Sequence, residues 1–127
     1  MTLFEECKEA LGADFNVVEG QALQDVIEVL HGFPFAQGNV MWTEMKSSDY
    51  ENIEALLSAH PIRDDDVFVF ADDKSVPVFR TNLKLVSENI YDVIALSPKL
   101  LIFNNEVILE PLFPTEMFRL GMKANAP

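Results

Sequence analysis

Apolar positions recur at helical spacing in four segments of the 127-residue chain. In the first segment, Thr2 and Glu5 have the capping-box spacing, in which a hydroxyl accepts from a helical N–H group and a carboxylate reaches back. This spacing predicts a first helix that begins there and ends with Gly12 as its left-handed cap. A second helix, over residues 23–30, should end at Gly32 because glycine interrupts the helical pattern.

The third and fourth helices are predicted by the same kinds of signal. Ser48 and the glutamate three residues later repeat the capping-box spacing, so the third helix should begin there and end by His60. The fourth helix should open at Ser87 and end before Pro98, although it could instead begin as early as Asn82.

Continuous and alternating apolar runs predict the strands. Residues 67–70 are apolar on both faces, which is typical of a strand covered on both sides, so this strand should be central in its sheet. The chain should return over residues 76–81 as the second strand of a hairpin, which would place Val67 opposite Arg80. The other predicted strands are 15–18, 40–45, 100–103, 106–109 and 117–122.

Asn104 and Asn105 separate two of these strands, and because asparagine tolerates positive φ we expect a tight hairpin there. With hairpins and helices interleaved around one core, the order of elements predicts an α+β fold with a mostly antiparallel sheet and about four helices. We expect a single domain over residues 1–127, with residues 123–127 frayed.

Composition and charge narrow the functional classes. Hydrophobic residues make up 49% of the chain, which is enough for a packed core and excludes a solvated acidic tail. Nine Lys and Arg residues stand against 21 Asp and Glu, for a net charge of −12. Phosphate binding rests on Lys and Arg, so nucleic acid and anionic membranes are poor partners. The amino terminus lacks the features of a signal peptide, which predicts a cytoplasmic protein.

Five carboxylates flank the predicted central strand and are the candidate partner-binding residues. At ~3.3 Å per residue the two groups lie about 16 Å apart, at opposite ends of the strand, and they lack the alternating ligands of a calcium loop. We therefore expect no metal site, and an ion pair between Arg80 and the group before the strand. The remaining carboxylates either meet a basic partner or keep the strand ends soluble. The five residues are Asp64, Asp65, Asp66, Asp72 and Asp73.

The other reactive side chains have structural interpretations. His31 and His60 fall at predicted helix ends, where an imidazole suits the last carbonyl groups. Cys7 lies on an apolar helix face and Trp42 on a predicted strand, so both are expected in the core. There is no Gly-x-Ser-x-Gly elbow and no glycine-rich phosphate loop, so the sequence predicts neither an enzyme nor a cofactor.

The chain resembles the small acidic immunity proteins of bacterial toxin and immunity cassettes, including those of contact-dependent growth inhibition. The resemblance lies in size, charge, α+β layout and lack of catalytic motifs; residues 78–82 and 95–98 look like family signatures without an assigned role. It implies a cytoplasmic protein, a monomer or weak homodimer, that neutralises a basic, nuclease-type toxin by forming a stoichiometric complex.

Two other classes stay open. Homodimeric secretion chaperones are also small, acidic and α+β, but they have a long C-terminal helix, whereas the segment after Pro98 is predicted as short strands and loop. An enzyme with dispersed catalytic residues is the third class. A chaperone should show an apolar groove, an enzyme a pocket with converging polar groups, and an inhibitor a focused acidic face.

Overall fold

The computed structural model describes residues 2–123. Its helices are α1 (Leu3–Ala10), α2 (Gly20–Leu30), the 3₁₀ turn η1 (Trp42–Glu44), α3 (Ile53–Ala59), α4 (Leu83–Glu88) and α5 (Ile90–Ile94). Its strands are β1 (Asn16–Val17), β2 (Phe35–Ala36), β3 (Asn39–Val40), β4 (Lys46–Tyr50), β5 (Asp66–Ala71), β6 (Phe79–Asn82), β7 (Leu100–Phe103), β8 (Val107–Pro111) and β9 (Phe118–Met122).

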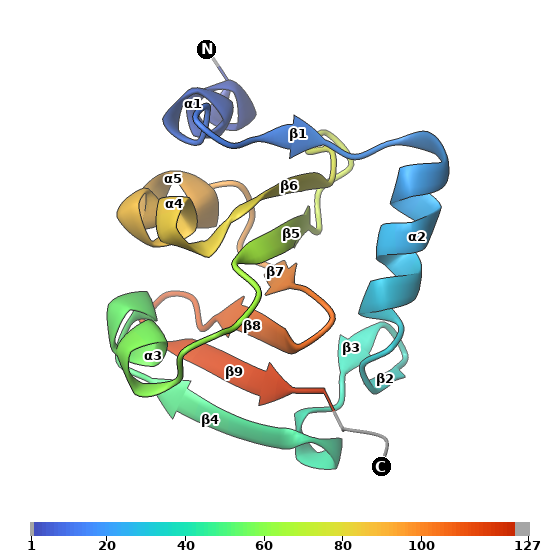
Figure 1. Cartoon of the computed structure of the whole chain (residues 1–127), viewed down its shortest axis with the longest axis vertical. Coiled ribbons are helices and arrows are strands. Elements are labelled where there is room, and N and C mark those ends of the chain that lie inside the picture. The colour runs from blue at the N-terminus through green and yellow to red at the C-terminus, as the bar shows by residue number, and fades with distance from the viewer. Residues whose placement is uncertain (1, 124–127) are drawn as a thin grey trace.

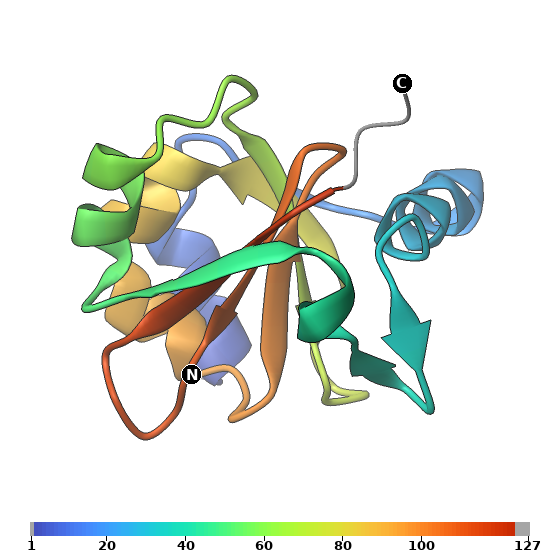
Figure 2. The ribbon, with the colours of Figure 1, turned by 90° about the horizontal axis from the view of Figure 1, so that it is seen from below.

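Seven of the strands form one sheet in the order β1-β6-β5-β7-β8-β9-β4, visible from top to bottom in Figure 1. All its neighbouring strands are antiparallel, and β2 and β3 form a separate ribbon. Helices α1, α3, α4 and α5 cover one face, while α2 and the ribbon lie on the other (Figure 2). The α+β class and the antiparallel sheet are confirmed.

Two hydrophobic cores lie on the two faces of this sheet. Val67 and Val69 of β5 point into the larger core beneath the four helices, whereas Phe68 and Phe70 pack into the smaller core under α2. The apolar pattern of β5 therefore does mark a strand covered on both sides, as predicted. The middle position of the sheet belongs to β7, whose four residues are all buried.

The first helix begins as predicted but ends differently. The Thr2 hydroxyl accepts from the Glu5 N–H group at 3.1 Å, and the Thr2 N–H group donates back to the Glu5 carboxylate at 3.3 Å. Gly12 is not a left-handed cap, because the C-cap is Leu11 and Gly12 has no positive φ. The Gly12 N–H group bonds to the Glu9 carbonyl at 3.2 Å, so a tighter last turn satisfies the helix end.

The predictions for residues 40–51 are wrong. Gln37 and Gly38 both have positive φ and close the β2–β3 ribbon, after which the chain forms η1 instead of a strand. Ser48 lies in β4, and Asn52 caps α3 by accepting from the Ala55 N–H group at 2.8 Å. The edge strand β4 is polar, so its sequence lacks an apolar alternation, and only pairing with β9 reveals it.

The earlier of the two alternatives for the fourth helix is correct. The Asn82 side chain accepts from the Leu85 N–H group at 2.9 Å and starts α4. Asn89 leaves the helical conformation and separates α4 from α5, while its amide donates to the Leu85 carbonyl at 2.9 Å. Two short helices therefore replace the single helix expected there.

The β5–β6 hairpin forms, but its predicted register is off by one residue. Phe68 pairs with Arg80, and Val67 pairs with Thr81 instead. The ladder stops at Val69 and Phe79, because the connecting loop is longer than the four-residue turn that the sequence suggested. Since a shift of one residue exchanges the faces of a strand, Arg80 lies on the face of Phe68, away from the larger core.

The β7–β8 hairpin is confirmed, but its turn depends on a buried side chain. Asn104 is 2% exposed, and neither it nor Asn105 has positive φ. Its side-chain oxygen accepts from the N–H groups of Glu106 and Val107 at 2.7 and 3.0 Å. Its amide donates to the carbonyl of Asp64, before β5, at 2.9 Å and to the carbonyl of Asp66, the first residue of β5, at 3.2 Å. Asn104 thus joins the hairpin to β5.

Of the residues 123–127 predicted to fray, the structure describes Lys123. The Lys123 N–H group donates to the Glu106 carbonyl at 3.0 Å. Residues 124–127 lie outside the described part of the chain.

Replacing Asn104 with alanine should destabilise the protein by about 2–4 kcal/mol, because it removes a buried side chain and its bonds to four backbone groups, one of them in a buried bond and three in partly buried ones. The adjacent exposed Asn105 is the matched control, and Asn105→Ala should stay within about 0.5 kcal/mol of wild type. Urea denaturation monitored by circular dichroism measures both changes. Equal losses for the two variants would contradict the anchoring role of Asn104.

Candidate functional site

The structure keeps the five predicted aspartates in two separate groups. Asp64, Asp65 and Asp66 lie at the start of β5, whereas Asp72 and Asp73 follow its end, six residues along the strand. Because β5 is extended, the two groups occupy opposite ends of the sheet. Among residues 2–123, no group of three or more His, Cys, Asp or Glu side chains is placed to hold a metal ion.

The group before β5 is largely engaged within the protein. Asp64 accepts from the Asp66 N–H group at 3.1 Å, and Asp66 pairs with Arg80 at 2.7 Å, which confirms the expected ion pair. A surface cavity of about 410 Å³ also brings Arg63 and Lys123 beside Asp64. Arg80 therefore pairs with one of the three aspartates, and Arg63 and Lys123 lie beside another.

Arg80 belongs to the segment 78–82, which looks like a family signature, and its contacts indicate a structural role for this segment. Its guanidinium pairs with Asp14 and bonds to the Asn16 side chain at 2.9 Å. Thr81 and Asn82 bond to the same Asp14, through its carbonyl at 2.7 Å and its carboxylate at 2.9 Å. The segment thus fastens the loop between α1 and β1 to the sheet, and the bonds from Arg80 hold the pKa of Asp14 below its usual value.

The other signature-like segment, residues 95–98, turns the chain from α5 into β7. Leu96 and Ser97 are buried, and the Ser97 hydroxyl accepts from the Lys99 N–H group at 3.2 Å. This segment also has a structural role.

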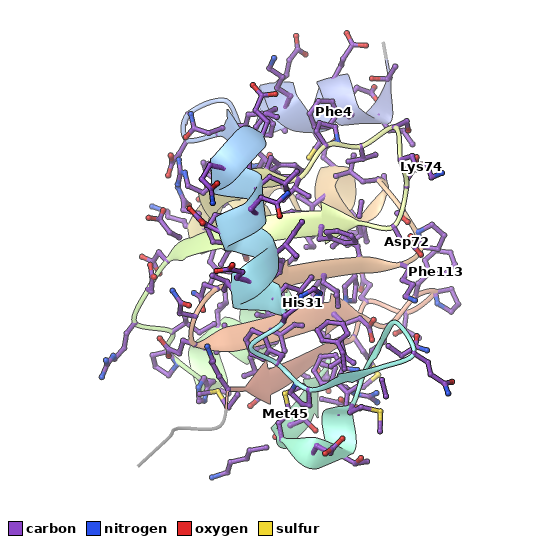
Figure 3. The ribbon with its side chains drawn as sticks, turned by 90° about the vertical axis from the view of Figure 1, so that its right-hand side faces the viewer. Phe4, His31, Met45, Asp72, Lys74 and Phe113 are labelled. Atoms are coloured by element: carbon purple, nitrogen blue, oxygen red, sulfur yellow. The ribbon has the colours of Figure 1, made fainter. Side chains whose placement is uncertain are left out.

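The group after β5 is exposed to solvent, as is the group before it. The Ser75 N–H and hydroxyl groups donate to the Asp73 carboxylate at 2.8 and 2.7 Å, which lowers the pKa of Asp73. Asp72 and Lys99 border a cavity of about 290 Å³ between the sheet and the β2–β3 ribbon. Figure 3 shows Asp72, Lys74 and Phe113 along one edge of the molecule.

A further acidic site was missed by the sequence analysis. A cavity of about 330 Å³ lies between α3, the α4–α5 junction and the β8–β9 loop. Tyr91 lines it, and its hydroxyl group donates a hydrogen bond to the Glu116 carboxylate. This bond raises the pKa of Tyr91. These segments are far apart in sequence, so no local motif could have predicted the cavity. Its carboxylate residues are Glu54, Glu88, Asp92 and Glu116.

The remaining candidate residues are structural. His31 and His60 occupy the C-cap positions of α2 and α3, as predicted. Cys7 is fully buried in the larger core, and burial raises the pKa of its thiol to about 12, so it is a poor nucleophile. Trp42 packs against Gly121 and the smaller core as expected, but from η1 instead of a strand.

The structure is that of a small acidic α+β protein with most of its carboxylate residues exposed on the surface. The family of CdiI immunity proteins described as EcoliA0-like matches residues 1–121, and the chain belongs to this family. It is therefore a toxin-neutralising immunity protein whose partner is a cognate toxin, as the sequence resemblance implied. None of the curated proteins matches the chain.

Family membership favours a non-enzymatic inhibitor over the secretion chaperone and the enzyme. Within residues 2–123, every helix is too short or too polar to cross a membrane.

The Asp14–Arg80 pair should make stability depend on pH. Since the folded pKa of Asp14 lies below 3.8, the pair stabilises the protein above about pH 4, and the contribution is lost as the pH falls through the lowered pKa. Asp14→Asn should therefore lower the urea midpoint at neutral pH, and the difference from wild type should shrink below about pH 4. A difference that stays constant into acid would contradict this role.

Proposed function

We propose that this immunity protein acts in the cytoplasm as a stoichiometric inhibitor of a basic, nuclease-type toxin. The excess of surface carboxylates carries the proposal. Among residues 2–123 the ion pairs use only Arg80 and Arg119, which engage three aspartates, while the chain has 21 acidic residues and nine basic ones. Most of the negative charge therefore remains available to an external partner.

The reason lies in the chemistry of the target. A toxin that cleaves nucleic acid needs a positively charged cleft, because its substrate is a polyanion. An inhibitor of opposite charge gains electrostatic steering, with association rate constants of up to ~10⁸ to 10⁹ M⁻¹s⁻¹ at low salt. Rapid capture protects the cell from the toxin, and the same carboxylates compete with the substrate for the cleft.

The five aspartates around β5 are proposed contacts for this toxin. Ala71 at the end of β5 pairs with Leu100, and Pro111 at the end of β8 pairs with Phe118. The Asp72–Asp73 loop therefore lies at the same end of the sheet as the β8–β9 loop. The group before β5 lies at the opposite end, among Arg63, Arg80 and Lys123. We expect Asp72 and Asp73 to contribute more.

The function is tested by titrating the cognate toxin with the immunity protein. The toxin is first captured from the native organism on the immobilised protein and identified by mass spectrometry. Cleavage of nucleic acid by the purified toxin should then stop once one equivalent of the immunity protein has been added. The immunity protein itself should be a monomer or a weak homodimer. A toxin without nuclease activity, or inhibition below one equivalent, would contradict the proposal in its present form.

Two double variants test the aspartates with equal changes in charge. Asp72→Asn with Asp73→Asn should slow association about three- to tenfold and flatten its salt dependence, because it removes steering charges. Asp64→Asn with Asp65→Asn should have a smaller effect and leaves the Asp66–Arg80 pair intact. Stopped-flow kinetics at several salt concentrations measure both. The control is Asp25→Asn with Glu28→Gln on the exposed side of α2. Unchanged rates for both test variants would remove these aspartates from the interface.

A further inference from the structure

The cavity between α3, the α4–α5 junction and the β8–β9 loop combines an apolar floor with an acidic rim. Ile53 and Phe118 line its floor and are each only 2% exposed. Its rim is formed by exposed carboxylate residues from four segments: Glu54 of α3, Glu88 of α4, Asp92 of α5 and Glu116 of the β8–β9 loop. Its volume of about 330 Å³ suits a single long side chain.

The rim carries negative charge that the protein itself does not neutralise. No lysine, arginine or histidine lines the cavity within the described residues. All ion pairs found in residues 2–123 involve Arg80 or Arg119, neither of which lines it. Glu54 and Glu116 both lie close enough to act electrostatically on the Tyr91 hydroxyl, so negative charge gathers at this part of the rim. A cation placed there would be attracted by it.

Two exposed aromatic side chains lie on the same segments. Tyr91 belongs to the cavity lining and is 67% exposed, and Phe113 in the β8–β9 loop is 68% exposed. Exposed apolar surface that forms a patch is a feature of sites that bind other proteins. Tyrosine is also enriched among the residues that dominate binding energy at protein interfaces.

We propose that this cavity is the docking site for a basic segment of the toxin, which inserts one Lys or Arg side chain among the four carboxylates. The proposal rests on the proposed function and specifies where the toxin binds. The methylene groups of the inserted side chain lie along Ile53 and Phe118, while its charged end reaches the rim. Tyr91 occupies one oxygen of Glu116, and the second oxygen accepts from the incoming cation.

Charge complementarity favours this occupant over a second copy of the chain. A symmetric dimer built on this surface would bring two identical acidic rims together, because the same patch contributes from both subunits. Like charges held close together oppose such a contact, and the chain as a whole carries −12. A basic toxin meets the same rim with the opposite charge.

The first test compares two fourfold variants of equal charge. The cavity variant carries E54Q, E88Q, D92N and E116Q, and the matched variant carries E9Q, E19Q, D25N and E28Q on exposed positions of α1, α2 and the residue before α2. Affinity for the purified cognate toxin, by calorimetry, should fall about tenfold or more for the cavity variant and less than about threefold for the matched one. Circular dichroism verifies that both variants fold.

Each outcome decides between the cavity and the broader function. Equal losses for the two variants would show that overall charge alone matters and would overturn the docking site, while one-to-one inhibition by the wild type would leave the proposed function standing. A wild-type protein that does not bind a basic toxin would end both proposals. A change in self-association without a change in toxin affinity would also overturn the docking site.

The second test examines the individual contacts. Tyr91→Ala should weaken toxin binding about five- to thirtyfold, whereas Tyr91→Phe, which keeps the ring, should cost less. A double-mutant cycle then combines Glu116→Gln with alanine substitutions of the toxin's Lys and Arg residues, one at a time. Coupling of about threefold or more with one of these cations is the expected result. Independent effects for all of them would exclude an inserted cation.

Discussion

The burial of the central strands on both faces is the constraint on which the rest of the structure depends. In β5, alternate residues enter the core beneath the four helices and the core beneath α2, and all four residues of β7 are buried. Such strands leave no solvent-facing side, so the chain must supply a layer of cover for each face. The polar strand β4 and the two-residue strand β1 end the sheet, and their exposed side chains suit edges.

This layered arrangement divides the polar chemistry between the two ends of the sheet. At the start of β5, Arg80 and Asn104 tie together the α1–β1 loop, the β6 strand and the β7–β8 hairpin. The carboxylates at that end, such as Asp66, are part of these connections. At the opposite end lie the β8–β9 loop and the Asp72–Asp73 loop, and no ion pair among the described residues involves their carboxylates.

Membership of the CdiI immunity protein family means that this chain has a cognate toxin as its partner. An immunity protein needs no catalytic group, and its chemistry consists of a surface that matches its toxin. Specific pairing is a difference between affinities, so it depends on a few well-placed contacts more than on total charge. A cavity that combines an apolar floor, an exposed tyrosine and converging carboxylates is better suited to such discrimination than charge spread over loops.

The sequence by itself determined the α+β class, the capping box of α1, the two-sided burial of β5, the structural character of Cys7 and the excess of acid. These follow from composition and from residues a few positions apart. Only the tertiary structure decided that Asn52 caps α3 in place of Ser48, that β4 is an edge strand and that Arg80 lies opposite Phe68. It also assembled the acidic cavity. Tyr91 and Glu116 are 25 residues apart in sequence and are brought together by strand pairing and helix packing. Patterns of neighbouring residues cannot predict such contacts.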